Sequence, residues 1–444
     1  MQHAHVWPET ATFNAQGHLT LGGCDVVELA NQYGTPLYLL DEATFRNNCR
    51  AYRTAIAQGY AGPGAIHYAG KALLNTAIAQ LVAQEHLGLD VVSGGELFVA
   101  LRAGFPAAHI HLHGNAKPCA ELERALEVGV GRIVVDTLDE LRELAALSAT
   151  LPSPQAILLR LAPDVAANTH AHIETGRAVS KFGLPLDALD AAASLIAAAP
   201  GLRLAGLHCH LGSQIFEQEP FVQAIGVLLD CAVRLRDQHG IQIDEISPGG
   251  GLGVPYVPEQ QLPDRQAFVA MIGQAMQNGC QQRNLPLLRL VLEPGRSIVA
   301  RAGVTIYRIL ASKPLPGQQT AERYLHIDGG MADNIRPSLY GARYTAVLAN
   351  RVGDTSHQQV VHIAGRYCES GDVLIHNLSL PQAELGDLLA VATTGAYTLS
   401  MASNYNLTTR PAVVLVGDQR AQLIQRRETY EDLVQRDVPI SPIS

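Results

Sequence analysis

One pattern recurs between about residues 65 and 295 and restricts the possible folds more than any other feature. A short apolar or β-branched run is followed by a polar or glycine turn, and then by a stretch with apolar residues at helical spacing. Alternation of strand and helix is typical of a parallel sheet, and eight such units fit a closed (β/α)8 barrel. An open doubly wound sheet is the alternative. The runs are Ala65–Ala69, Leu89–Val92, Ile110–Leu112, Arg132–Val135, Ala156–Leu161, Leu204–Cys209, Ile243–Ile246 and Arg289–Leu292.

The pattern changes after Arg296, where strand-like runs follow one another without long helices between them. Residues 1–40 contain similar pieces. The length of 444 residues also favours two domains. We therefore predict an α/β chain with a barrel at 40–296 and a second, mostly β domain formed by 1–39 and 297–444. Its expected strands are His18–Leu21, Leu37–Leu40, Val304–Leu310, Arg323–Ile327, Gln359–Ala364, Asp387–Ala392 and Ala412–Val416.

Charge and cysteine usage exclude several classes of function. The net charge of −9 offers no electrostatic basis for binding nucleic acid or an anionic membrane. No apolar run approaches the ~20 residues that cross a bilayer. The first residues lack a basic region followed by an apolar core, so we expect no signal peptide. The seven cysteines are scattered without a C-x-x-C pair. They indicate free thiols in a reducing, cytoplasmic environment.

Catalytic groups of a barrel lie just after the C-terminal ends of its strands. Polar and glycine residues gather at those positions here, which a barrel with only a structural role would not need. We expect the active site among them. They are Lys71, Ser93–Glu96, His113–Asn115, Asp136, His210, Gly249–Gly251 and Glu293–Arg296.

Lys71 and the glycine run each allow a catalytic and a structural interpretation. Lys71 ends the first strand, where partial burial would lower the pKa of its amine and make it a nucleophile. A surface lysine is the alternative. Gly249–Gly251 follow the seventh strand, and backbone N–H groups there can surround a phosphate. A tight turn is the alternative.

His208 and His210 end the sixth strand and share one face, which makes a metal pair conceivable. No third ligand occurs at suitable spacing and no acidic cluster lies beside them, so we expect no metal. The residue types fit better with His210 lying on a flat cofactor ring and Ser213 bonding its phosphate.

Two further segments carry candidate groups. Glu293 could hold a ring nitrogen protonated, and Arg296 could bind a phosphate or carboxylate as a fork. A structural ion pair at a turn is the alternative. Cys368 stands beside Glu369 in a glycine-broken turn of the second domain, which makes it a candidate proton donor. Most lone cysteines are buried small hydrophobes.

Taken together, these motifs resemble the fold-type III PLP-dependent amino-acid decarboxylases, and among them the diaminopimelate decarboxylases. The resemblance covers about residues 25 to 420. One departure lies at the lysine segment Tyr68–Leu73, where the family often has valine before the lysine and asparagine soon after. The matching segments are Leu89–Glu96, Thr175–Gly176, Ser180–Gly183, His208–Gln214, Glu293–Arg296, Arg336–Ala342, Cys368–Asp372, Gly395–Tyr397 and Met401–Asn406.

The resemblance implies pyridoxal 5'-phosphate (PLP) as cofactor, with Lys71 holding it as a Schiff base. It also implies that His210 stacks on the ring and that Glu293 pairs with the pyridinium nitrogen. Tyr397 would line the cofactor site. The phosphate would be bound by Ser213, Gly249, Gly250, Gly251, Gly295 and Arg296.

The resemblance further implies a substrate with two amino-acid heads, meso-2,6-diaminopimelate, converted to L-lysine in the last step of lysine biosynthesis. Arg336 and Tyr340 would hold the far carboxylate and Glu369 the far amine, with Arg296 and Tyr397 also near the substrate. Cys368 would be the general acid. In this family Cys368 and Glu369 come from the partner subunit, which implies a homodimer with shared sites.

Three other functions stay open. Another decarboxylase of this fold, acting on ornithine, lysine, arginine or a secondary-pathway substrate, would lack groups for a distal carboxylate. A racemase would need a tyrosine base in place of the Cys368-Glu369 turn. A catalytically inactive regulator usually lacks the lysine or the cysteine, and both are present here.

Overall fold

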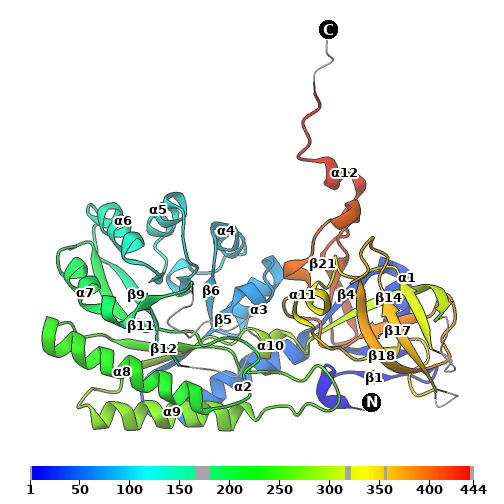
Figure 1. Ribbon diagram of the computed structural model, residues 1–444, viewed down its shortest axis with the longest axis horizontal. Helices are drawn as coiled ribbons and strands as arrows, with labels where there is room; N and C mark the ends of the chain where they lie inside the picture. Colours follow the sequence, from blue (N-terminus) through cyan, green and yellow to red (C-terminus); the bar gives the residue numbers. More distant parts are fainter. Residues whose placement is uncertain (1–2, 166–180, 316–321, 355–357, 441–444) are drawn as a thin grey trace. The chain divides into compact units, whose positions relative to one another are not determined.

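The computed structural model describes residues 3–165, 181–315, 322–354 and 358–440. The chain divides into two compact units. Figure 1 shows it coloured by position in the sequence, from blue at the N-terminus to red at the C-terminus. We call the two units the barrel unit, Arg46–Val254 with Pro263–Ile298, and the β-rich unit, Met1–Phe45 with Pro255–Leu262 and Val299–Ser444.

Eight parallel strands of the barrel unit form a closed ring. The last of them, β13, pairs with the first, β5, through Leu292 and Ile66, and β8 pairs with β9. This closure confirms the predicted barrel, and the open doubly wound alternative is wrong. A two-residue strand, β10 (Leu184–Pro185), adds to β9. The eight strands are β5 (Gly64–Ala69), β6 (Gly88–Val91), β7 (Ile110–Leu112), β8 (Arg132–Val135), β9 (Gln155–Ala162), β11 (Leu202–His208), β12 (Glu245–Gly249) and β13 (Arg289–Leu292).

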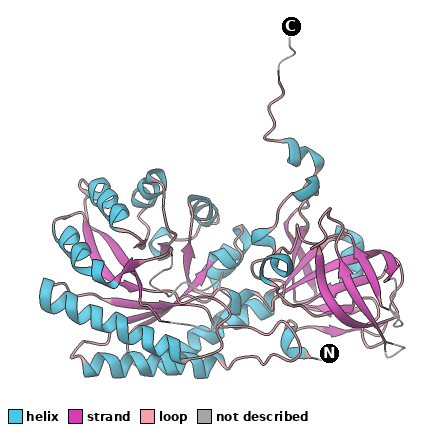
Figure 2. Cartoon of the chain, in the orientation of Figure 1, coloured by secondary structure: helices cyan, strands magenta, loops and turns pink. Residues whose placement is uncertain are grey.

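Helices follow the strands and surround them in Figure 2. Several begin at a side-chain cap placed directly after a strand. Ser93 accepts a hydrogen bond from the Glu96 N–H, and Thr137 accepts one from the Glu140 N–H, which fixes where each helix starts. The helices are α2 (Glu42–Gly59), α3 (Thr76–Gln84), α4 (Gly94–Arg102), α5 (Cys119–Val128), α6 (Leu138–Ser148), α7 (Leu189–Ala197), α8 (Glu219–His239), α9 (Arg265–Gln282) and α10 (Arg296–Val299).

Strand β12 begins and ends later than the sequence pattern predicts. The predicted run was Ile243–Ile246, whereas the strand includes Ser247 and continues to Gly249. Glu245 is fully buried in it because Arg132 donates a hydrogen bond to its carboxylate at 2.8 Å. A buried glutamate followed by Pro248 does not read as a strand, so hydrophobic periodicity missed this shift.

The β-rich unit contains a small antiparallel sheet of three strands within residues 12–25 and a larger mixed sheet into which the N-terminal segment inserts. Strand β4 (Leu37–Asp41) lies between β14 (Gly303–Pro314) and β20 (Ala412–Gly417). All the expected strands are present. Its core includes Trp7, Leu19, Leu37, Val304 and Val414. The others are β1 (Thr12–Phe13), β2 (Leu19–Leu21), β3 (Cys24–Asp25), β15 (Arg323–Ile327), β16 (Ala346–Leu348), β17 (Gln358–Ala364), β18 (Val373–Pro381), β19 (Leu388–Val391) and β21 (Arg420–Gln425), with helices α1 (Val26–Tyr33), α11 (Arg336–Tyr340) and α12 (Tyr430–Val434).

In this unit, sequence periodicity missed β1, β3, β16, β18 and β21. Within β18, Asn377 adopts a left-handed φ of 54°, which interrupts the alternation of buried and exposed side chains.

Among the described residues, no helix is long and apolar enough to cross a membrane.

Candidate active site

Lys71 lies in a short 3-10 turn, Gly70–Ala72, directly after β5. Burial lowers the pKa of its ammonium group and the charge of Arg160 lowers it further, while Glu293, Asp90 and Glu96 offset part of this. A lysine with a lowered pKa offers a neutral amine more readily, which is what attack on a carbonyl requires.

Glu293 follows β13 and is held by one side chain from the adjacent strand β12 and one from β11, the next strand in the ring. Ser247 Oγ donates a hydrogen bond to its Oε1 at 2.6 Å, and His208 Nε2 lies 3.1 Å from its Oε2. Burial alone would raise the pKa of this carboxyl, but His208 and His113 lower it to about 2. Glu293 therefore presents a negative charge in the barrel interior at neutral pH.

Ser213 and Arg296 form a polar pair in the segments that follow β11 and β13. The Arg296 guanidinium donates to Ser213 Oγ from Nε at 3.1 Å and from Nη2 at 3.0 Å. A fork of N–H donors beside a hydroxyl can bind a phosphate or a carboxylate.

The glycine run Gly249–Gly251, which ends β12 and begins the following loop, is required by packing. A Cβ at Gly250 would overlap the Glu293 carbonyl, and one at Gly249 would lie 2.7 Å from the Cys209 carbonyl oxygen. Gly249 and Gly251 also have left-handed φ values of 79° and 122°. This loop therefore allows backbone to approach closely where side chains could not.

His210 lies just past β11 and is half-buried. Burial lowers the pKa of its imidazole well below the usual value, and the charges of Lys71 and Arg160 lower it further. A neutral ring at this position suits stacking better than ion pairing.

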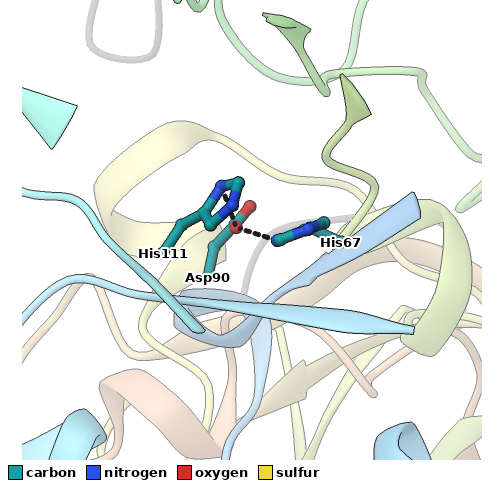
Figure 3. Close-up of side chains that lie close together, drawn as sticks. All are labelled: His67, Asp90 and His111. Atoms are coloured by element: carbon teal, nitrogen blue, oxygen red, sulfur yellow. Dashed lines mark hydrogen bonds and ion pairs between the residues drawn. The ribbon is translucent and has the colours of Figure 1, made fainter. Parts of the chain in front are cut away.

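Two groups of imidazoles and carboxylates converge inside the barrel. One contains His67, Asp90 and His111, shown in Figure 3; the other contains His113, His208 and Glu293. Sequence spacing offers no third ligand beside His208 and His210, but strand pairing brings His113 and Glu293, which are far apart in the chain, close to His208. Sequence reasoning also assigned no role to Asp90 and none to Ser247, although both lie on predicted or adjoining strands.

In the β-rich unit, Arg336 is buried at the start of α11 between two tyrosines. Its guanidinium lies 4.6 Å from the ring centre of Tyr256 and donates a hydrogen bond to the Tyr344 hydroxyl. Although burial lowers the pKa of Arg336, the two tyrosines raise it above the usual value. The side chain is thus a fixed cation. Tyr340 ends the same helix and is half-buried.

Cys368 and Glu369 are exposed within this unit. The Cys368 N–H donates to Asn406 Oδ1 at 3.1 Å, and the Tyr405 hydroxyl donates to Glu369 Oε1 at 2.8 Å. Tyr397 has a left-handed φ of 57° and is half-buried. The hydrogen bonds from the Cys368 N–H to Asn406 and from Tyr405 to Glu369 hold the turn that carries the Cys368 thiol.

One sequence motif is only partly described. Thr175, Gly176 and Ser180 lie outside the described residues. In the remaining part, the Gly183 N–H donates to Asp136 Oδ1 at 3.0 Å, at the end of β8.

Known proteins match this chain along nearly its whole length. Residues 42–300 match the family model of the pyridoxal-dependent decarboxylase, pyridoxal binding domain. The diaminopimelate decarboxylase of Bacillus subtilis is 43% identical over 433 residues, covering 97% of each chain. That of Synechocystis is 42% identical and covers 97% of this chain and 92% of its own.

Solved structures agree with the sequence matches. The structure of diaminopimelate decarboxylase from M. jannaschii in complex with L-lysine has a TM-score of 0.90 at 33% identity, covering 99% of both chains. A lysine/ornithine decarboxylase from Vibrio vulnificus in complex with putrescine has a TM-score of 0.74 at 26% identity, covering 88% of this chain and 98% of its own.

Proposed function

Since the chain belongs to the pyridoxal-dependent decarboxylases, and within them to the diaminopimelate decarboxylases, we propose that it removes one carboxylate from meso-2,6-diaminopimelate. The products are L-lysine and carbon dioxide, and we assign the reaction to the last step of lysine biosynthesis. The observation that carries this proposal is the 43% identity over 97% of the chain to a diaminopimelate decarboxylase, against 26% for the lysine/ornithine enzyme.

The cofactor is PLP, and the barrel residues fit it. When bound, PLP supplies an electron sink for the pair of electrons that the departing carboxylate leaves behind. Glu293 carries the negative charge that keeps a ring nitrogen protonated, and Lys71 offers the amine for covalent attachment. The Ser213–Arg296 pair provides donors for a phosphate. We further assign contacts with the cofactor to His210, Gly249, Gly250, Gly251, Gly295 and Tyr397.

In this proposal, the residues that bind the far carboxylate and the far amine of the substrate come from the β-rich unit. Arg336 binds the far carboxylate, with Tyr340 beside it, and Glu369 binds the far amine. Arg296 and Tyr397 also contact the substrate. The burial of Arg336 supports this, because a cation surrounded by tyrosines gains much from an anionic partner.

Cys368 donates the proton that replaces the lost carboxylate. The thiol is exposed on its own unit, which is consistent with delivery into the site of a second subunit. We propose a homodimer in which Cys368 and Glu369 complete the partner's active site. All seven cysteines are free thiols, which agrees with a cytoplasmic location.

Product analysis tests the proposal. The purified protein, reconstituted with PLP, is incubated with meso-2,6-diaminopimelate, and L-lysine and carbon dioxide are measured together. We expect equal amounts of both. Cadaverine from L-lysine, without L-lysine from diaminopimelate, would instead identify a diamine-forming decarboxylase.

A further inference from the structure

Three histidines surround one carboxylate oxygen in the interior of the barrel unit. Asp90 Oδ1 lies 3.1 Å from His67 Nδ1, 3.4 Å from His113 Nε2 and 3.9 Å from His111 Nδ1. All four side chains are buried, with at most 7% of each residue exposed. Figure 3 shows the contacts of His67 and His111 with Asp90, and the ring centres of the two histidines lie 3.9 Å apart.

Strand pairing creates this arrangement. β5, β6 and β7 are adjacent parallel strands, and Asp90 pairs directly with His111. His111 and His113 are two residues apart, so they point to the same side of the sheet. Gly88 pairs with His67, and a Cβ at Gly88 would overlap the His67 ring. The glycine therefore leaves room for the imidazole to turn toward Asp90.

The cluster contains polar atoms that the protein itself does not satisfy. Within the described part of the chain, Asp90 Oδ2, His111 Nδ1 and His113 Nε2 have no hydrogen-bond partner. Buried polar atoms normally have one, and leaving several unpaired at one point is costly. The hydrogen bond from His67 accounts for only one of the oxygens of Asp90. The unpaired atoms thus point to a ligand that contacts all of them.

We propose that His67, Asp90 and His111, with His113 as a fourth ligand, form a binding site for a divalent transition-metal ion of the zinc type. Imidazole and carboxylate are the ligands that zinc, cobalt and nickel accept, whereas calcium and magnesium require mostly oxygen. Ligand atoms at ~2.0–2.1 Å from a tetrahedral ion lie roughly 3.3 Å apart. The distances of 3.1, 3.4 and 3.9 Å to Asp90 Oδ1 bracket that value, and the ligand atoms of His67, Asp90 and His111 all lie within 4.8 Å of one another. The rings of His67 and His111, whose centres are 3.9 Å apart, turn away from each other when both bind the ion.

The neighbouring group around Glu293 is a poorer metal site. Both oxygens of Glu293 have partners, Ser247 and His208, whereas Asp90 Oδ2 has none. His113 Nε2, which also faces Glu293, lies nearer to Asp90 Oδ1, at 3.4 Å, than to Glu293 Oε1, at 3.9 Å. The decarboxylation proposed above assigns no role to His67 or His111, whereas the charges of Asp90 and His113 also act on Lys71 and Glu293. The success or failure of the ion site does not depend on which amino acid the enzyme decarboxylates.

Metal binding to the untagged holoenzyme tests the site. The protein is dialysed against zinc ions and its metal content is measured, and cobalt is used as a spectroscopic probe of the ligands. We expect one ion per chain and a four-coordinate cobalt absorption spectrum. His111→Phe, which keeps a ring of similar size, and His67→Ala should each weaken binding at least about tenfold.

His362→Ala is the matched control. Its ring nitrogens also lack hydrogen-bond partners, but it belongs to the β-rich unit. This variant should bind the ion as the wild type does. Absence of a bound ion in the wild type, or equal binding by all variants, would overturn the proposal. If the barrel variants do not fold, the proton NMR spectrum of the wild-type cobalt complex decides: paramagnetically shifted histidine ring signals support the site, and their absence refutes it.

Discussion

The Nε2 atom of His208 lies 3.1 Å from Oε2 of Glu293, which joins the end of β11 to the residue that follows β13. The contact is buried, and with Ser247 it occupies both oxygens of the carboxylate. This relationship keeps Glu293 ionised and fixed in the barrel interior.

Glu293→Gln should retain PLP but decarboxylate much more slowly, by about 10²-fold or more. The amide cannot hold a ring nitrogen protonated as a carboxylate does. Single-turnover kinetics on the reconstituted variant measure the effect. Ser247→Ala is the control, since it removes one hydrogen bond and leaves the charge. An unchanged rate in Glu293→Gln would remove Glu293 from the chemistry.

The same carboxyl should make the stability of the fold sensitive to acid. Its pKa is about 2 in the folded protein, against ~4.3 in an unfolded chain. A lowered pKa contributes stability that is complete above the unfolded value and is lost as the pH falls toward 2. Urea unfolding between pH 2 and pH 6 should show a steeper loss for the wild type than for Glu293→Gln. Parallel curves would contradict the assignment.

Lys71→Ala should abolish both the visible absorbance of the bound cofactor and the activity. Lys117 cannot substitute, because it is buried and its ammonium donates to Glu140 at 2.6 Å. Borohydride reduction followed by peptide mapping identifies the modified lysine in the wild type. A reduced adduct at Lys117 or Lys181 in Lys71→Ala would place the cofactor elsewhere.

Cys368→Ala should keep the cofactor spectrum and turn over far more slowly, since only the proton donor is lost. If the sites are shared, mixing this variant with Lys71→Ala should restore up to about one normal site per heterodimer. Activity is measured after subunit exchange has been verified. Lack of recovery would indicate that each site is formed by one chain.

Gly250→Ala should weaken PLP binding, although the change adds only a methyl group. The new Cβ would overlap the Glu293 carbonyl and force the loop or the end of β13 to move. Gly371→Ala is a suitable control, because a Cβ there meets no atom within 4 Å. Equilibrium dialysis gives the two affinities, and similar values would show that the loop adapts.

Hydrophobic periodicity was enough to predict the eight barrel strands, because each is a local run that faces the core. It failed at Glu245, whose burial depends on Arg132, a residue more than 100 positions away. It also failed at Asn377, where a left-handed residue interrupts β18. A local sequence pattern contains no information on a distant ion-pair partner such as Arg132, or on a left-handed backbone conformation such as that of Asn377.

Some residues of the candidate site could likewise be predicted from the sequence, and others could not. Lys71, Glu293 and Arg296 could be named because barrel strands end at predictable places. The partners of Glu293 and the histidines around Asp90 could not, because strand register decides which side chains meet. The two tyrosines around Arg336 likewise come from separate segments, Tyr256 from the Pro255–Leu262 stretch and Tyr344 from the residues after α11.

Arg336→Ala should cripple turnover of meso-2,6-diaminopimelate selectively. The residue is a buried cation, and we propose that it binds the far carboxylate of the substrate. Tyr344→Phe is the control, since it removes a hydrogen bond to the guanidinium and keeps the charge. A variant that loses diaminopimelate turnover should also lose much of its discrimination against L-lysine.

Specificity constants are the most direct test of the proposed substrate. The kcat/KM values of the wild type are measured for meso-2,6-diaminopimelate, L-lysine and L-ornithine under the same conditions. A site built around a polar substrate group can reject an analogue that lacks it by roughly 10⁴-fold. We predict a preference of that order for meso-2,6-diaminopimelate. A higher kcat/KM for L-lysine or L-ornithine would contradict the account.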